Sequence, residues 1–67
     1  MCEANAYFYR NGNEELILET VDLVEPQENG SFLLKNIYGD QKIVKGRIRI
    51  MNLVNHRIVF EEQAEEF

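Results

Sequence analysis

The residues best suited to chemistry stand at the start of the chain, where Cys2 follows Met1. The Met1 amine, the Cys2 amide nitrogen and the Cys2 thiolate can close two adjacent five-membered chelate rings on one metal ion. If Met1 is removed, the Cys2 amine and thiolate still form one such ring. A lone cysteine is more often a small buried hydrophobe, but a chain end is usually exposed. The position of Cys2 therefore favours a metal ligand.

The donors at this N-terminus are nitrogen and sulfur, which narrows the choice of metal. Mg²⁺ and Ca²⁺ prefer oxygen ligands. A structural zinc site normally takes four Cys or His ligands, and this chain has only Cys2 and His56 of those types. Square-planar Ni(II) or Cu(II) remains, and Cu(II) competes because the Irving–Williams order places it above Ni(II). Since one chain supplies only two or three donors, a two-fold dimer that brings both copies of Cys2 together would complete the coordination.

His56 is a second candidate metal ligand. It follows the turn residue Asn55 and has the strand parity of Ile58 and Phe60, which predicts that it leans toward the interior. The alternative is a histidine that is hydrogen-bonded where a strand begins. Both interpretations stay open from the sequence.

Basic side chains are concentrated in one segment and suggest a different function. Residues 35–57 hold six basic residues against one acid, in a chain whose net charge is −5. Lys45, Arg47 and Arg49 are spaced to form one solvent-facing row, and together with Tyr38 such a row could contact the phosphates of RNA. The alternative is an outer face whose charges prevent aggregation and are partly neutralised by glutamates near the C-terminus.

Short β-strands are the elements that must position these residues. Turn signals recur about every 8–12 residues, as in a small all-β domain. Asn11-Gly12 and Asn29-Gly30 are the strongest of them, because both residue types tolerate positive φ. In Arg47-Ile48-Arg49-Ile50 the two isoleucines alternate with arginines, which predicts that both isoleucines face the core. The expected strands are residues 4–10, 14–19, 21–27, 31–36, 41–45, 46–52 and 56–61.

Six or seven short strands in 67 residues leave no room for two large packed sheets. We therefore expect one small, strongly bent β-barrel of antiparallel strands, SH3- or Sm-like in size. Gly46 interrupts a long β-prone run and predicts a bulge or a barrel corner. The domain should cover residues 1–62, with residues 63–67 as an acidic tail. So short a chain has a marginal core and no intrachain disulfide, so a homodimer is expected.

Composition argues against several classes of protein. A sequence pI near 4.7 argues against a general phosphate-coating protein. One His, one Cys and no glycine-rich phosphate loop argue against an enzyme. The N-terminus carries Glu3 where a signal peptide would carry positive charge, and no apolar stretch approaches the ~18 residues of a membrane span. We therefore expect a cytoplasmic protein.

Several short segments together resemble a known family. They are Met1-Cys2-Glu3-Ala4, Glu14-Glu15-Leu16-Ile17-Leu18-Glu19, Val21, Val24-Glu25-Pro26, Tyr38-Gly39-Asp40-Gln41-Lys42, Gly46-Arg47-Ile48 and Asn55-His56-Arg57-Ile58-Val59-Phe60-Glu61. In this order, over roughly residues 1–62, the chain resembles the CooT family of small nickel-binding proteins. These proteins are associated with nickel delivery to carbon monoxide dehydrogenase, and many are described as predicted RNA-binding proteins.

The resemblance implies a compact β-rich fold and a homodimer, with Ni(II) held at the dimer interface by the cysteine at position 2. In this chain that residue is Cys2, with backbone nitrogens near Met1 and Cys2 as co-ligands. The implied function is a metallochaperone, or a delivery or storage protein, for a nickel enzyme such as carbon monoxide dehydrogenase. RNA binding by a small barrel is the alternative. A weaker likeness is to hydrogenase-maturation chaperones, which also begin Met-Cys, but the Pro-Gly pattern that usually follows there is absent.

Overall fold

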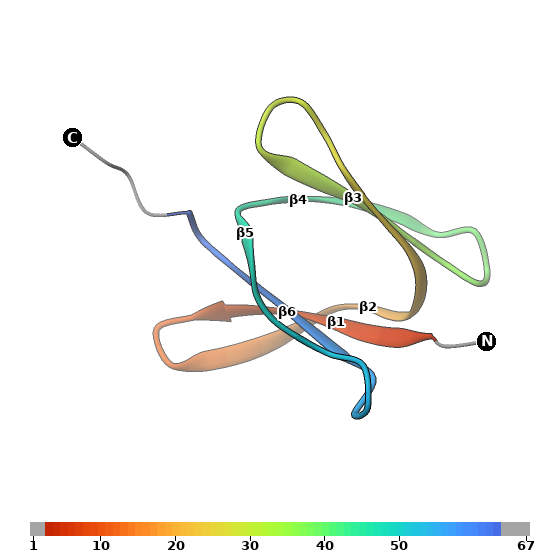
Figure 1. The fold of residues 1–67 in the computed structure, drawn as a ribbon, viewed down its shortest axis with the longest axis horizontal. Helices are drawn as coiled ribbons and strands as arrows, with labels where there is room; N and C mark the ends of the chain where they lie inside the picture. Colours follow the sequence, from red (N-terminus) through yellow and green to blue (C-terminus); the bar gives the residue numbers. More distant parts are fainter. Residues whose placement is uncertain (1–2, 64–67) are drawn as a thin grey trace.

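The structure is a computed structural model that describes residues 3–63 of the 67-residue chain. That range contains six β-strands, β1 (Ala4–Arg10), β2 (Asn13–Pro26), β3 (Ser31–Asn36), β4 (Gln41–Lys45), β5 (Arg47–Asn52) and β6 (Arg57–Glu61) (Figure 1). The all-β prediction is confirmed. Within the described residues, no helix is long and apolar enough to cross a membrane.

All six strands belong to one sheet, in the order β4-β3-β2-β1-β6-β5. Neighbouring strands are antiparallel except for β1 and β6, which run parallel, with Asn5 beside Arg57 and Tyr9 beside Glu61. The prediction of antiparallel strands throughout is therefore wrong. The hairpin of β5 and β6 joins the sheet at the side of β1 that faces away from β2. Its strand β6 lies next to β1 and runs in the same direction.

The predicted closed barrel is also wrong, because the edge strands β4 and β5 form no ladder with each other. These strands are consecutive in the chain and are separated only by Gly46. At this glycine the chain turns sharply away from the line of β4 (Figure 1). The two edges of the sheet therefore meet at one corner and do not lie alongside each other.

Gly46 forms this corner because a side chain has no room there. Its φ of 138° lies in a region that only glycine adopts readily. A Cβ atom on Gly46 would lie 2.2 Å from the carbonyl oxygen of Glu61. The Gly46 N–H also donates to the carbonyl of Gly30, at 3.4 Å. The sharp corner that the sequence predicts at this residue is present.

β2 is a single long strand with a bulge at Thr20, where two separate strands were expected. Its pairing with β1 shifts register between Leu18 and Val21, and Thr20 has a φ of 51°. Before the bulge β2 pairs with β1. Just after it, Val21 lies between Ala4 of β1 and Asn36 of β3, and from Leu23 onward β2 pairs with β3 alone. The bulge thus lets one strand bend from one half of the sheet into the other.

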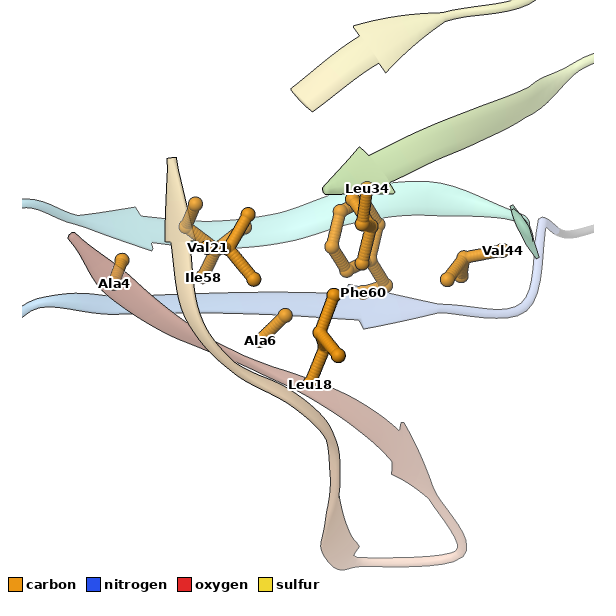
Figure 2. Packing of buried hydrophobic residues seen from close by; sticks show 8 residues of the cluster. All are labelled: Ala4, Ala6, Leu18, Val21, Leu34, Val44, Ile58 and Phe60. Atoms are coloured by element: carbon orange, nitrogen blue, oxygen red, sulfur yellow. The ribbon is translucent and has the colours of Figure 1, made fainter. Parts of the chain in front are cut away.

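The core is small and is built mainly from alternate residues of the strands. Its buried members are Ala4, Ala6, Leu18, Val21, Leu34, Val44, Ile58 and Phe60 (Figure 2). Phe60 is fully buried, and its ring centroid lies 5.3 Å from that of Phe32. Ile48 packs against this cluster, but Ile50 is exposed. The prediction that both isoleucines face the core is wrong, because the register between β5 and β6 shifts between them.

Candidate functional site

The segment with the predicted metal donors precedes β1, which begins at Ala4. Met1 and Cys2 lie outside the described residues. Glu3 is therefore the nearest residue to Cys2 that the structure places. Its surroundings define the point at which the predicted donors join the sheet.

Two turns share this end of the sheet with the N-terminus. Asn5 in β1 lies beside Arg57, and Arg57 lies opposite Asn52, so the turn of residues 53–56 is at the N-terminal end. On the other side of β1, the Ile37 N–H donates to the carbonyl of Thr20, so the turn of residues 37–40 is at the same end. Figure 1 shows the start of β1 and the turn between β3 and β4 on the same side of the molecule. We call this region the N-terminal end of the sheet.

His56 lies directly beside the N-terminal segment. Its Nδ1 atom is 3.0 Å from the carbonyl oxygen of Glu3. Because a carbonyl oxygen only accepts, the ring hydrogen must be on Nδ1, which leaves the lone pair of the neutral ring on Nε2. The His56 carbonyl also accepts from the Asn5 N–H, at 2.9 Å. The structure thus places His56 as a hydrogen-bonded residue before a strand, and metal binding through its other ring nitrogen stays a prediction.

The predicted inward orientation of His56 is wrong. His56 is exposed and belongs to the turn before β6, which begins at Arg57. Its φ of 57° is left-handed, so the alternation of Ile58 and Phe60, both buried, does not continue back to it.

No three His, Cys, Asp or Glu side chains among residues 3–63 come together in a way that could hold a metal ion. His56 is therefore not part of a metal centre formed by those residues alone. A metal centre that included His56 would need further donors from outside residues 3–63 or from a second chain.

Large apolar side chains are exposed around the N-terminal end of the sheet. In the turn of residues 53–56 they are Leu53 and Val54, the latter 86% exposed, and in the turn of residues 37–40 they are Ile37 and Tyr38, the latter 75% exposed. The turn that carries Tyr38 is ordered by Asn36, whose Oδ1 accepts from the Tyr38 N–H at 3.0 Å. The two turns lie at opposite edges of the sheet, so these side chains form two separate exposed apolar groups, each of a kind typical of protein contacts.

Two of the four predicted RNA-binding residues share one acidic partner. Arg47 and Arg49 both pair with Glu61, at 2.8 Å and 3.0 Å, and the Arg49 guanidinium lies 3.9 Å from the ring centroid of Tyr9. Lys45 ends β4 before the Gly46 corner, and Tyr38 precedes the other end of that strand. Two of the four residues are thus used in an ion-pair network.

One ion pair in the structure was not predicted from the sequence. Arg57 pairs with Glu14, and its guanidinium lies 5.2 Å from the ring centroid of Tyr7. The partners are 43 residues apart, and they meet only because β6 lies beside β1. No local pattern signals this pairing.

The two arginines hold the pKa of Glu61 below its ordinary value of 4.5, chiefly through the hydrogen bond from Arg49 and then that from Arg47. A carboxylate whose pKa is lowered by folding adds stability above its unfolded-state pKa, and this stability is lost as the pH falls through the folded-state pKa. We expect Glu61→Gln to be less stable than the parent at pH 7, and the deficit to shrink below about pH 4. Urea unfolding midpoints across this pH range measure it.

Glu62→Gln is the matched control for this prediction, because Glu62 is the next residue and is exposed. It should unfold at nearly the parent midpoint at every pH. A deficit of Glu61→Gln that is the same in acid as at neutral pH would contradict the electrostatic explanation.

Comparison with known proteins gives a family and a fold. A family model described as "CO dehydrogenase accessory protein CooT" matches residues 1–61. The crystal structure of a protein assigned as CooT, from Carboxydothermus hydrogenoformans, is similar with a TM-score of 0.86 and 43% sequence identity, covering 94% of this chain and 100% of that one. No match was found among curated proteins.

The family model begins at Met1 and ends at Glu61, the last residue of β6. It therefore includes the Met1-Cys2 segment, the whole sheet and the His56 turn beside Glu3. The matching crystal structure shares this sheet over its full length. Since both comparisons extend over nearly all of the sequence, the chain belongs to the CooT family of CO dehydrogenase accessory proteins.

Proposed function

We propose that this protein binds Ni(II) through Cys2 at the interface of a homodimer and carries or stores the metal for a nickel enzyme such as carbon monoxide dehydrogenase. Nickel is then a cargo, and the protein is an accessory factor without catalysis of its own. The observation that carries the proposal is the family match, which includes residues 1 and 2 and is described by accessory function to this enzyme. Because the matched residues include Cys2, which is the one cysteine in the chain, the match supports a role for this residue in the accessory function.

The need for a second copy follows from the number of donors. The described residues hold no metal-binding cluster, and the Met1-Cys2 segment supplies two or three donors. Two such segments related by a two-fold axis supply enough nitrogen and sulfur for a square-planar ion. The exposed Leu53 and Val54 lie at the same end of the sheet and favour a protein contact there.

The donor atoms of the Met1-Cys2 segment are of the kinds that bind Ni(II) and Cu(II). Thiolate and amine or amide nitrogen ligands favour Ni(II) and Cu(II) over the oxygen-seeking Mg²⁺ and Ca²⁺. Cu(II) is a competitor because it binds most such sites more tightly than Ni(II) does. Selectivity for nickel therefore depends on which metal is supplied.

Titration of the protein with Ni(II) tests the proposal. We expect thiolate-to-nickel charge-transfer absorption that saturates at one ion per dimer, with the dimer measured by native mass spectrometry. Because the chain has one cysteine, Cys2→Ser should abolish this absorption and weaken binding at least about tenfold, since the loss of both thiolate ligands of the dimer is worth more than about 1.4 kcal/mol.

Two controls accompany this titration. Circular dichroism should show that Cys2→Ser keeps the parent fold, because the core residues found among residues 3–63 do not depend on the substituted side chain. Cu(II) should compete with Ni(II) for the parent and not for the variant. Nickel binding by Cys2→Ser as tight as that of the parent would refute the proposal.

RNA binding is not proposed. Arg47 and Arg49 are paired with Glu61, while Lys45 is the last residue of β4 and Tyr38 lies in the turn before that strand. The arrangement matches the alternative reading, in which charges on an outer face are partly neutralised by a glutamate near the C-terminus.

A further inference from the structure

Three hydrogen bonds hold the first described residues of the chain in place. The His56 Nδ1–H donates to the Glu3 carbonyl, at 3.0 Å, and the Asn5 N–H donates to the His56 carbonyl, at 2.9 Å. On the other side, the Thr20 N–H donates to Oδ1 of Asn5, at 3.1 Å. We call Asn5, Thr20 and His56 the N-terminal anchor.

Two of the anchor residues have unfavourable backbone conformations. The non-glycine residues with positive φ among residues 3–63 are Asn11, Thr20 and His56. Asn11 lies in the turn between β1 and β2, where asparagine is common. Thr20 is β-branched, for which a left-handed φ is a true outlier, and its buried Oγ1 has no hydrogen-bond partner among the described residues. The backbone strain outside ordinary turn chemistry is thus concentrated at the anchor.

The choice of histidine at position 56 has a specific consequence. Glycine or asparagine adopts a left-handed φ at lower cost, so the turn itself does not require histidine. What the imidazole adds is the Nδ1–H that reaches the Glu3 carbonyl. Only one peptide unit separates Glu3 from Cys2. His56 therefore acts on the backbone immediately next to the predicted donors.

We propose that His56 is a positioning residue for the Met1-Cys2 donors and not one of the metal ligands. It holds Glu3 and Asn5 and so fixes the direction in which the donor segment leaves the sheet. Ordering this segment before the metal arrives lowers the entropy that binding must remove. The inference rests on the proposed nickel site and deepens it, because it names the residue that prepares the donors.

Two substitutions at this position separate positioning from ligation. His56→Asn tolerates the left-handed φ, retains an amide N–H donor near the place of Nδ1, and has no ring nitrogen to bind a metal. His56→Gly keeps the backbone conformation and removes the donor. Asn11→Gly is the matched control, since it makes the same kind of change at a left-handed residue in the opposite turn.

The expected results are a nickel affinity about tenfold lower in His56→Gly and nearly the parent affinity and charge-transfer spectrum in His56→Asn and Asn11→Gly. In the metal-free proteins, ¹⁵N order parameters of Glu3 and Ala4 should fall in His56→Gly and stay at the parent value in the other two. This second measurement depends on no metal and reports the position of the segment directly.

Any other outcome of these measurements contradicts either the positioning role of His56 or the proposed nickel site. Equal losses of affinity in His56→Asn and His56→Gly would make His56 a ligand and overturn the inference. Parent-like affinity and order parameters in His56→Gly would show that His56 has no role, while the nickel site itself stood. A parent protein without Cys2-dependent nickel absorption would instead refute the proposed function, a result distinguishable from the previous two.

Discussion

Gly46→Ala should remove a large part of the protein's free energy of unfolding. The new Cβ would lie 2.2 Å from the Glu61 carbonyl oxygen, so the backbone of β6 or the Gly46 corner must move, and the φ of 138° adds strain. Together these effects cost about 2–6 kcal/mol. The stability of a 67-residue domain is about 3–10 kcal/mol in total. The urea unfolding midpoint, followed by circular dichroism, measures the loss.

Gly12→Ala is the matched control for this substitution. Gly12 also has a positive φ, of 81°, but a Cβ there would have no atom within 4 Å. We expect it to cost about 1–2 kcal/mol, from backbone strain alone. The difference between the two variants measures the close approach of Gly46 to Glu61. Equal and small losses would show that the corner is not tightly packed.

Phe60→Ala should have a comparable effect through the core. The Phe60 side chain is fully buried and contacts the ring of Phe32 among few large core residues. Truncation removes its transfer free energy and leaves a cavity, at a cost of about 3–5 kcal/mol. Linear extrapolation of urea unfolding gives the free energy of unfolding of each variant. Phe60→Leu is expected to cost less than about 1.5 kcal/mol, so it provides a second test if Phe60→Ala does not fold.

Tyr38→Ala is the control for Phe60. Its side chain is 75% exposed, and the hydrogen bond that orders its turn comes from its backbone N–H. We expect a change within about 0.5 kcal/mol. A loss of less than about 1 kcal/mol in Phe60→Ala would contradict the placement of this ring at the centre of the core.

The strands and most turns could be predicted because their signals are local. Asn11-Gly12 and Asn29-Gly30 both form turns, and both glycines have positive φ. The sequence predicts two strands divided at Thr20, where the structure has a bulge within one continuous strand, β2. Nothing in the local sequence marks threonine as the residue that adopts a left-handed conformation.

Features that depend on register between distant strands could not be predicted. Ile50 alternates correctly with Ile48, yet a register shift against β6 leaves it exposed. The parallel pairing of β1 with β6 joins residues about fifty positions apart, and neither strand carries a pattern that specifies its partner. The open sheet edges follow from the same long-range arrangement.

The sequence predicts the kinds of donor atom at the candidate site, but it does not predict how the residues beside them are arranged. The residue types of Met1 and Cys2 and their place in the chain indicate nitrogen and sulfur donors without any structure. The hydrogen bond from His56 to Glu3 spans 53 residues. Its existence depends on β6 lying next to β1, so the sequence leaves His56 with two interpretations.

The parallel pairing of β1 with β6 also sets the order in which the molecule is assembled. The first strand obtains one of its two neighbours only from the last strand, and closing so long a loop is entropically slow. During synthesis, the N-terminal end cannot form its bonds to His56 until nearly the whole chain has left the ribosome. An incomplete chain therefore lacks the hydrogen bond between His56 and Glu3, and the N-terminal anchor forms only at the final step of folding.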